Sequence, residues 1–164
     1  MMKRVILLMI LGVATTPWSV TAVYADTCQE VSGKFNEFIL PRESAPNDPF
    51  GRVLGNVDGS LEGTTTAFLT SFSPGANGSV HVTTFNVFVT QEGNQLFTRG
   101  TADWAFIKAG VYQVELTLSI VGGTGKYANA SGSIAVLGVG NNVLPGRPGQ
   151  FVQEYRGQLC KPTR

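Results

Sequence analysis

Residues that carry acid–base, redox or metal chemistry are scarce in this sequence. Its 164 residues include one histidine, His81, and two cysteines, Cys28 and Cys160. No Gly-x-Ser-x-Gly segment supplies the nucleophile of a serine hydrolase. One histidine does not make a zinc site when the cysteines are better explained as a disulfide. We therefore expect no metal and no cofactor, and we interpret His81 as an ordinary strand residue.

Charge is sparse as well. Asp, Glu, Lys and Arg make up 14% of the chain, against about 25% in an average soluble domain. The 12 basic residues nearly balance the 11 acidic ones. No basic patch is therefore expected to bind nucleic acid electrostatically, and uncharged polar side chains must cover much of the surface.

Long apolar runs are missing except near the N-terminus. Lys3 and Arg4 precede a ten-residue apolar run, Val5 to Ala14, which is shorter than the roughly 20 residues that span a bilayer. A polar segment follows. This order is typical of a secretory signal peptide, cleaved after the small residue Ala25 or, alternatively, after Ala22. A buried N-terminal helix is the other interpretation.

We expect residues 1–25 to be a signal peptide and residues 26–164 to form one secreted domain, extracellular or periplasmic, without membrane contact after cleavage. The two cysteines lie just inside the ends of that domain. In an exported protein they are expected to pair, so the first and last strands must be neighbours. Two free buried thiols are the alternative.

Helical periodicity is absent throughout the rest of the chain. Instead, eight β-branched and aromatic runs alternate with Gly, Asn and Pro clusters, which is typical of an antiparallel sandwich or barrel. The proline-bounded segment 41–49 is expected to be a mobile flap. A bridge between the first and last runs favours closure, which removes unpaired edges. The runs lie near 29–40, 51–63, 64–73, 79–91, 95–107, 111–121, 131–140 and 150–160.

Alternation along these runs assigns side chains to faces. In the run 111–121, every second residue from Tyr112 to Ile120 is apolar or aromatic, and Gln113 to Ser119 fill the other face with polar groups. Alternation assigns inward-facing residues on the other runs in the same way. The residues expected to line a ligand are Phe35, Trp104, Tyr112, Leu116, Gln153 and Tyr155.

One carboxylate breaks the pattern. Glu37 is in phase with Phe35 and Ile39, so it is expected on an apolar wall with a raised pKa, the setting in which Glu serves as a general acid or base. Glu37 is therefore the candidate catalytic residue. The alternative is that Phe38 and Leu40 face inward and Glu37 is in solvent.

A glycine cluster at Gly122, Gly123 and Gly125 superficially matches a phosphate-binding loop. Ile120 stands in place of the first glycine of that motif, Tyr127 replaces its Ser or Thr, and no helix follows. We interpret the three glycines as a structural turn with several positive φ angles, Gly123 included.

The segment 120–134, IVGGTGKYANASGSI, resembles a signature of the allene oxide cyclase and dirigent barrels, Ile-x-Gly-Gly-Ser/Thr-Gly-x-Phe/Tyr-x-x-Ala-x-Gly. The resemblance implies an all-β, eight-stranded antiparallel closed barrel with an apolar cavity, often assembled as a homodimer or homotrimer. Cyclases of this kind guide a lipid epoxide to one stereoisomer, and dirigent proteins steer phenoxy radical coupling. Glu37 and Pro46 repeat a Glu-to-Pro spacing of the cyclases, whereas Ile39 stands where those enzymes have asparagine.

The sequence thus predicts a secreted barrel that binds a small apolar molecule in its lumen and steers an isomerisation or cyclisation by confinement. The competing hypothesis is a non-catalytic structural or interaction barrel with a packed interior. Eight strands are only just wide enough to be filled by side chains or to hold one small ligand, so cavity size separates the two hypotheses.

Overall fold

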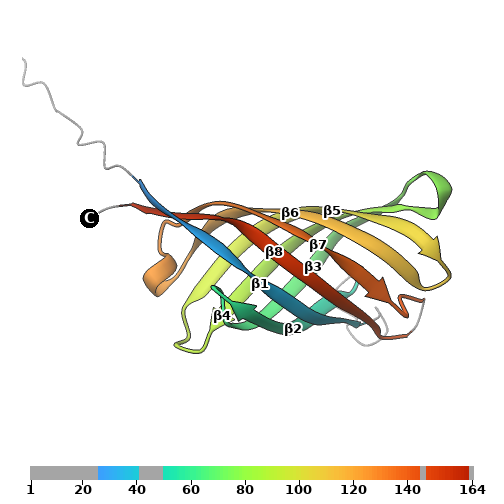
Figure 1. Ribbon diagram of the computed structural model, residues 1–164, viewed down its shortest axis with the longest axis horizontal. Helices are drawn as coiled ribbons and strands as arrows, with labels where there is room; N and C mark the ends of the chain where they lie inside the picture. The colour runs from blue at the N-terminus through green and yellow to red at the C-terminus, as the bar shows by residue number, and fades with distance from the viewer. Residues whose placement is uncertain (1–25, 41–49, 145–146, 163–164) are drawn as a thin grey trace, which may run out of the picture.

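The computed structural model describes residues 26–40, 50–144 and 147–162. The expected signal peptide and the expected flap at 41–49 lie outside the described residues. The described residues form eight strands and two short 3-10 turns, Ala76–Gly78 (η2) and Gly125–Tyr127 (η3) (Figure 1). The strands are β1 (Asp26–Leu40), β2 (Arg52–Gly59), β3 (Gly63–Pro74), β4 (Val80–Thr90), β5 (Gln95–Lys108), β6 (Val111–Gly123), β7 (Ser131–Asn141) and β8 (Gly149–Pro162).

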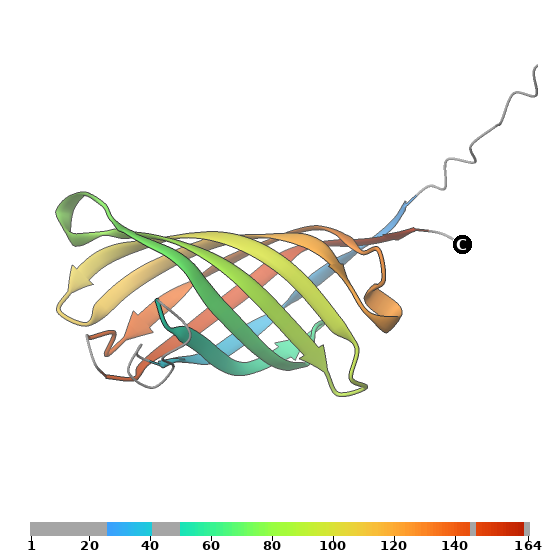
Figure 2. The same cartoon turned by 180° about the vertical axis from the view of Figure 1, so that it is seen from behind.

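The strands form one closed barrel in sequence order, and every neighbouring pair is antiparallel. Figure 2 shows the same barrel from behind, with its strands tilted across the long axis. The predicted fold class is confirmed. The second strand is shorter than expected because Gly59 adopts φ +84° and starts a turn into β3. Within the described part of the chain, no helix is long and apolar enough to cross a membrane.

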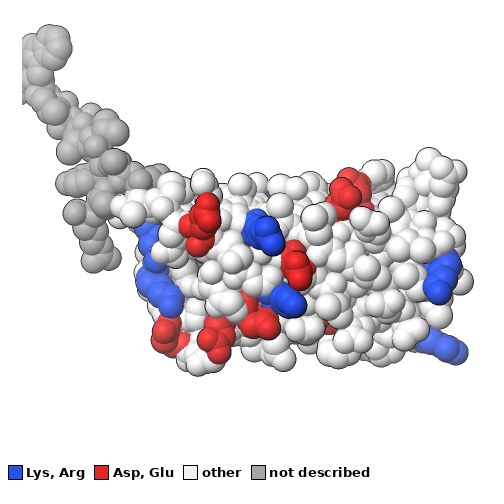
Figure 3. Space-filling view, in the orientation of Figure 1, with Lys and Arg blue, Asp and Glu red and all other residues white. Residues whose placement is uncertain are grey.

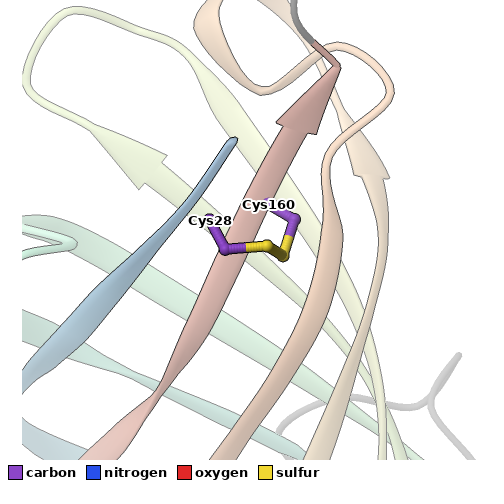
Figure 4. The surroundings of a disulfide bond; sticks show 2 residues. All are labelled: Cys28 and Cys160. Atoms are coloured by element: carbon purple, nitrogen blue, oxygen red, sulfur yellow. A yellow bond between two sulfur atoms is a disulfide. The ribbon is translucent and has the colours of Figure 1, made fainter. Parts of the chain in front are cut away.

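The disulfide closes the barrel where its first and last strands meet. Cys28 on β1 lies directly opposite Cys160 on β8, and their sulfur atoms are 2.09 Å apart (Figure 4). The β1–β8 ladder continues from this bridge to the Ile39–Gly149 pair. The predicted pairing of the two cysteines is therefore confirmed, and it joins strands that already form a continuous antiparallel ladder.

The barrel interior is divided along its axis. We call the end that carries the first and last described residues the terminal end (Figure 1). A large apolar cluster fills this end and includes Val31, Leu61, Tyr127 and Leu159. A smaller cluster toward the opposite end includes residues such as Trp104 and Phe151. The site described below is lined by five of the buried polar side chains: Glu37, Thr65, Thr84, Asn86 and Gln153.

The glycine turn joins β6 to β7 at the terminal end. Gly122 and Gly125 have φ angles of +126° and +54°, as a left-handed turn requires. A positive φ was also expected at Gly123, and that expectation is wrong because the φ of Gly123 is not positive. Gly123 is needed for space: an added Cβ would collide with the Gln95 carbonyl oxygen and lie 2.7 Å from Tyr127 Cβ.

Replacing Gly123 by valine is therefore expected to destabilise the fold by about 1–3 kcal/mol through overpacking. The measurement is a urea unfolding curve of Gly123→Val. Gly93→Ala in the β4–β5 hairpin is the control for an added side chain without a collision, because its added Cβ meets no atom within 4 Å. Its φ of +80°, unlike that of Gly123, is itself unfavourable for alanine, so its loss of stability measures backbone strain without overpacking. Equal midpoints for wild type and Gly123→Val would contradict the steric argument.

Candidate functional site

A cavity lies between the two apolar clusters, and side chains from seven of the eight strands line it. Its volume is about 40 Å³, which is room for about three water molecules. The lumen is thus narrow and nearly filled.

Glu37 lies in this cavity on β1. Its side chain is 8% exposed, so the predicted inward phase is correct and the alternative phase is wrong. Burial raises the pKa of the Glu37 carboxyl from 4.5 to about 7, and a hydrogen bond with the Thr65 side chain partly offsets that rise. Near neutral pH this carboxyl is therefore neutral in a large fraction of molecules.

Glycine on the neighbouring strand makes room for Glu37. The cross-strand row runs from Glu37 on β1 through Gly55 on β2 to Thr65 on β3. An added Cβ on Gly55 would lie 2.7 Å from Glu37 Cγ and 2.6 Å from Glu37 Cα. The glycine therefore allows the carboxyl to lean across β2 toward the Thr65 hydroxyl.

Gln153 on β8 is the second polar group of the wall and is 4% exposed. It is diagonal to Glu37, because Gln153 pairs with Phe35 and Glu37 pairs with Phe151. Its Oε1 atom is buried and has no hydrogen-bond partner among the described residues. A Cβ on the facing Gly138 would lie 2.5 Å from Gln153 Cγ. Here too a glycine leaves space for a polar side chain.

A third polar group faces the cavity from β4 and was not anticipated from the sequence. Asn86 is 3% exposed, and its Nδ2 atom donates to Thr84 Oγ1 and Thr98 Oγ1, each at 3.0 Å. The sequence pattern conceals this group, because Phe85 and Val87 on the other face are more apolar than the residues that point inward. Gly100 on the neighbouring strand was the available sequence signal that polar side chains have space on this wall. An added Cβ there would lie 2.6 Å from Thr84 Oγ1, the atom that accepts from the Asn86 amide.

Aromatic rings form much of the remaining cavity wall. Trp104 and Phe151 have ring centroids 5.2 Å apart, and Phe35 and Phe88 stack at 5.7 Å. Of the residues expected to line a ligand, the structure places four around the cavity together with Glu37: Phe35, Trp104, Leu116 and Gln153. No Lys, Arg or His is among the described residues that line it.

The structure places Tyr112 and Tyr155 outside the cavity wall. Tyr112 is half-buried beside Trp104, with ring centroids 6.2 Å apart. Tyr155 belongs to the apolar cluster of the terminal end. Its hydroxyl donates to the Asp58 carbonyl at 2.9 Å and accepts from the Leu61 N–H at 3.0 Å. Tyr155 therefore anchors the β2–β3 turn.

Tyr155→Phe is expected to lower the free energy of unfolding by about 1–3 kcal/mol, because it leaves the buried Leu61 N–H without its partner. Chemical denaturation measures this loss. Tyr112→Phe is the matched control, since no hydrogen bond of the Tyr112 hydroxyl is observed within the described residues. A Tyr155→Phe variant as stable as wild type would show that the hydroxyl does not stabilise the turn.

The outer surface carries mixed charge. Lys34 Nζ lies 3.7 Å from Glu154 Oε1, and Figure 3 shows acidic and basic side chains interspersed on the face that carries β1 and β8. His81 is exposed and pairs through Nδ1 with Asp103 on the adjacent strand. In the described ranges, no three His, Cys, Asp or Glu side chains cluster closely enough to hold a metal ion.

Comparisons with known proteins assign no family to the chain. No protein-family model matches it, and no curated protein sequence matches it. Among solved structures, the pterocarpan synthase dirigent protein GePTS1 aligns over 85% of this chain and 87% of its own, at 12% identity and a TM-score of 0.34. A likeness this weak supports no argument, so the fold assignment rests on the strand pairing, and the resemblance of the segment 120–134 stays a prediction.

Proposed function

We propose that the barrel binds a small, mainly apolar molecule that carries at least one hydrogen-bond donor. The single observation behind this proposal is the unpartnered Oε1 atom of Gln153. Leaving a buried acceptor unpaired costs about 1–3 kcal/mol, and an apolar residue of similar size at this position would avoid that cost. A donor on a bound molecule would recover it.

The two apolar clusters support one direction of entry. The terminal end is filled by the larger cluster, which includes the buried ring of Tyr127. The cavity lies next to the smaller cluster, toward the end where β1 finishes and β2 begins. We therefore propose that a ligand enters from that opposite end. A benzene-sized molecule would need lining side chains to change rotamer, because the enclosed space is small.

Glu37 gives the same cavity a limited capacity for acid–base catalysis. A carboxyl with a pKa of about 7 can donate or accept a proton near neutral pH, as a general acid or base requires. We propose that any reaction here is an isomerisation or cyclisation in which confinement orients the substrate and Glu37 moves one proton. Secretion through the N-terminal leader remains part of this proposal.

The small enclosed volume favours a second candidate function. Ligand pockets are usually about 300–1,000 Å³, whereas the volume of this lumen is only about 40 Å³. A structural or interaction barrel, with a few waters on Gln153 and Glu37, would fit that volume without any rearrangement.

Tryptophan fluorescence distinguishes the two functions. The chain has two tryptophans, Trp18 and Trp104, so Trp18→Phe leaves Trp104 in the cavity wall as the only reporter. Small apolar alcohols, phenols and amines are expected to shift its emission saturably. Gln153→Leu should weaken that binding by about tenfold, whereas Gln158→Leu on the exposed face of β8 should not. The absence of any saturable response would favour the packed barrel.

A further inference from the structure

We propose that the ligand of this cavity is a small hydrophobic amine, bound as its cation with its N–H groups directed at the Glu37 carboxylate and Gln153 Oε1. This inference rests on the proposed function, because it names the chemical class of the molecule that occupies the same lumen. Hydrogen-bonding capacity, the aromatic wall and the charge balance of the cavity support it independently.

Two acceptors in the cavity are available to a ligand. Gln153 Oε1 is buried without a partner, and the Glu37 carboxylate, when it is ionised, is an acceptor only. The Gln153 amide N–H groups are donors as well. The Thr84 and Thr98 hydroxyls accept from Asn86 and keep their own O–H donors. All of these donors are uncharged, so none of them neutralises an ionised Glu37. One ammonium group brings three N–H donors and a positive charge, whereas an alcohol brings one donor and no charge.

The aromatic wall suits a cation. Trp104, Phe151, Phe35 and Phe88 all line the cavity. The faces of such rings attract a nearby ammonium group through their quadrupole, most strongly for tryptophan and when water is excluded. The same rings bury the apolar part of the ligand. An anionic ligand finds no Lys, Arg or His among the described lining residues and would be repelled by ionised Glu37.

Among the described residues that line the cavity, Glu37 alone is ionisable. The groups that face it from the packed strands are Gly55 on β2, Thr65 on β3, and Phe151 and Gln153 on β8. None of these titrates near neutral pH. A bound cation stabilises the carboxylate, so amine binding at or below neutral pH should expel a proton from Glu37. Charge-assisted hydrogen bonds to that carboxylate are stronger than neutral ones.

The test compares benzylamine, benzyl alcohol and toluene, which share one ring and differ in their polar group. Trp104 emission in the full chain carrying Trp18→Phe reports binding. At pH 8 benzylamine is expected to bind at least tenfold more tightly than benzyl alcohol, and this preference should shrink at pH 5. Glu37→Gln should abolish the preference, and Glu154→Gln on the exposed face of β8 should retain it.

A second measurement needs no variant. Titration calorimetry of benzylamine at pH 6.5, in buffers with different ionisation enthalpies, should show proton release by the protein, whereas benzyl alcohol should release none. Equal affinity of the three compounds, or amine binding without proton release, would overturn the amine assignment and leave the proposed binding function standing. Failure of all three compounds to bind would overturn both.

Discussion

The double variant Cys28→Ser/Cys160→Ser is expected to unfold with a free energy about 4–5 kcal/mol lower than that of the wild type. The bridge joins residues separated by 132 positions, so it removes a large part of the conformational entropy of the unfolded chain. The β1–β8 ladder stays available in the variant. The barrel should therefore keep its fold in mild conditions and lose only stability.

Urea unfolding monitored by far-ultraviolet circular dichroism measures this loss. The wild type treated with a reductant is the matched comparison, because it breaks the same bond without changing a side chain. The reduced wild type and the double variant should have similar midpoints, both well below that of the oxidised protein. Coinciding midpoints for the oxidised and reduced proteins would show that the bridge adds nothing to barrel closure.

The second large effect is the pH dependence of stability that Glu37 creates. Folding raises the pKa of this carboxyl from 4.5 to about 7, so the native state disfavours its ionised form. Stability is unaffected by Glu37 below pH 4.5, falls as pH rises from 4.5 to 7, and stays lower above pH 7. The shift corresponds to a loss of about 3 kcal/mol.

Glu37→Gln removes this loss because a glutamine stays neutral at every pH. The stability of the variant relative to the wild type should therefore rise by about 3 kcal/mol between pH 4 and pH 8. The same difference for Glu154→Gln should be close to zero, because that carboxyl is exposed. Parallel pH profiles for the wild type and Glu37→Gln would show that folding does not raise the pKa of the Glu37 carboxyl.

Much of the barrel was predictable because the period of a strand is two. On β6 the apolar side chains from Tyr112 to Ile120 occupy one phase, and the structure buries Val114, Leu118 and Ile120 of that phase completely or nearly so. On β1 apolar residues occupy both phases, Phe35 and Ile39 in one and Phe38 and Leu40 in the other. The inward position of Glu37 was therefore one of two predictions, and the structure selected it by burying Glu37 and exposing Phe38.

The rest of the candidate site could not be predicted, and β4 shows why. Its outward residues Phe85, Val87 and Val89 are apolar, and its inward residues include Thr84 and Asn86. A contrast in polarity between the two faces therefore gives the wrong orientation for the middle of this strand. The polar residues face inward because Thr98 and Thr84 satisfy the Asn86 amide there. That compensation depends in part on Thr98, which lies on the neighbouring strand β5.

The sequence by itself predicted the all-β class, the strand boundaries to within a few residues and the pairing of Cys28 with Cys160, and it offered the inward phase of Glu37 as one of two phases. These properties depend on local periodicity and on one covalent link. Only the tertiary structure decided that Gly55 and Gly138 make room for Glu37 and Gln153, and that the enclosed space is small. Cavity volume and the satisfaction of buried polar atoms depend on how closely side chains from seven strands approach one another, and no single strand encodes that approach.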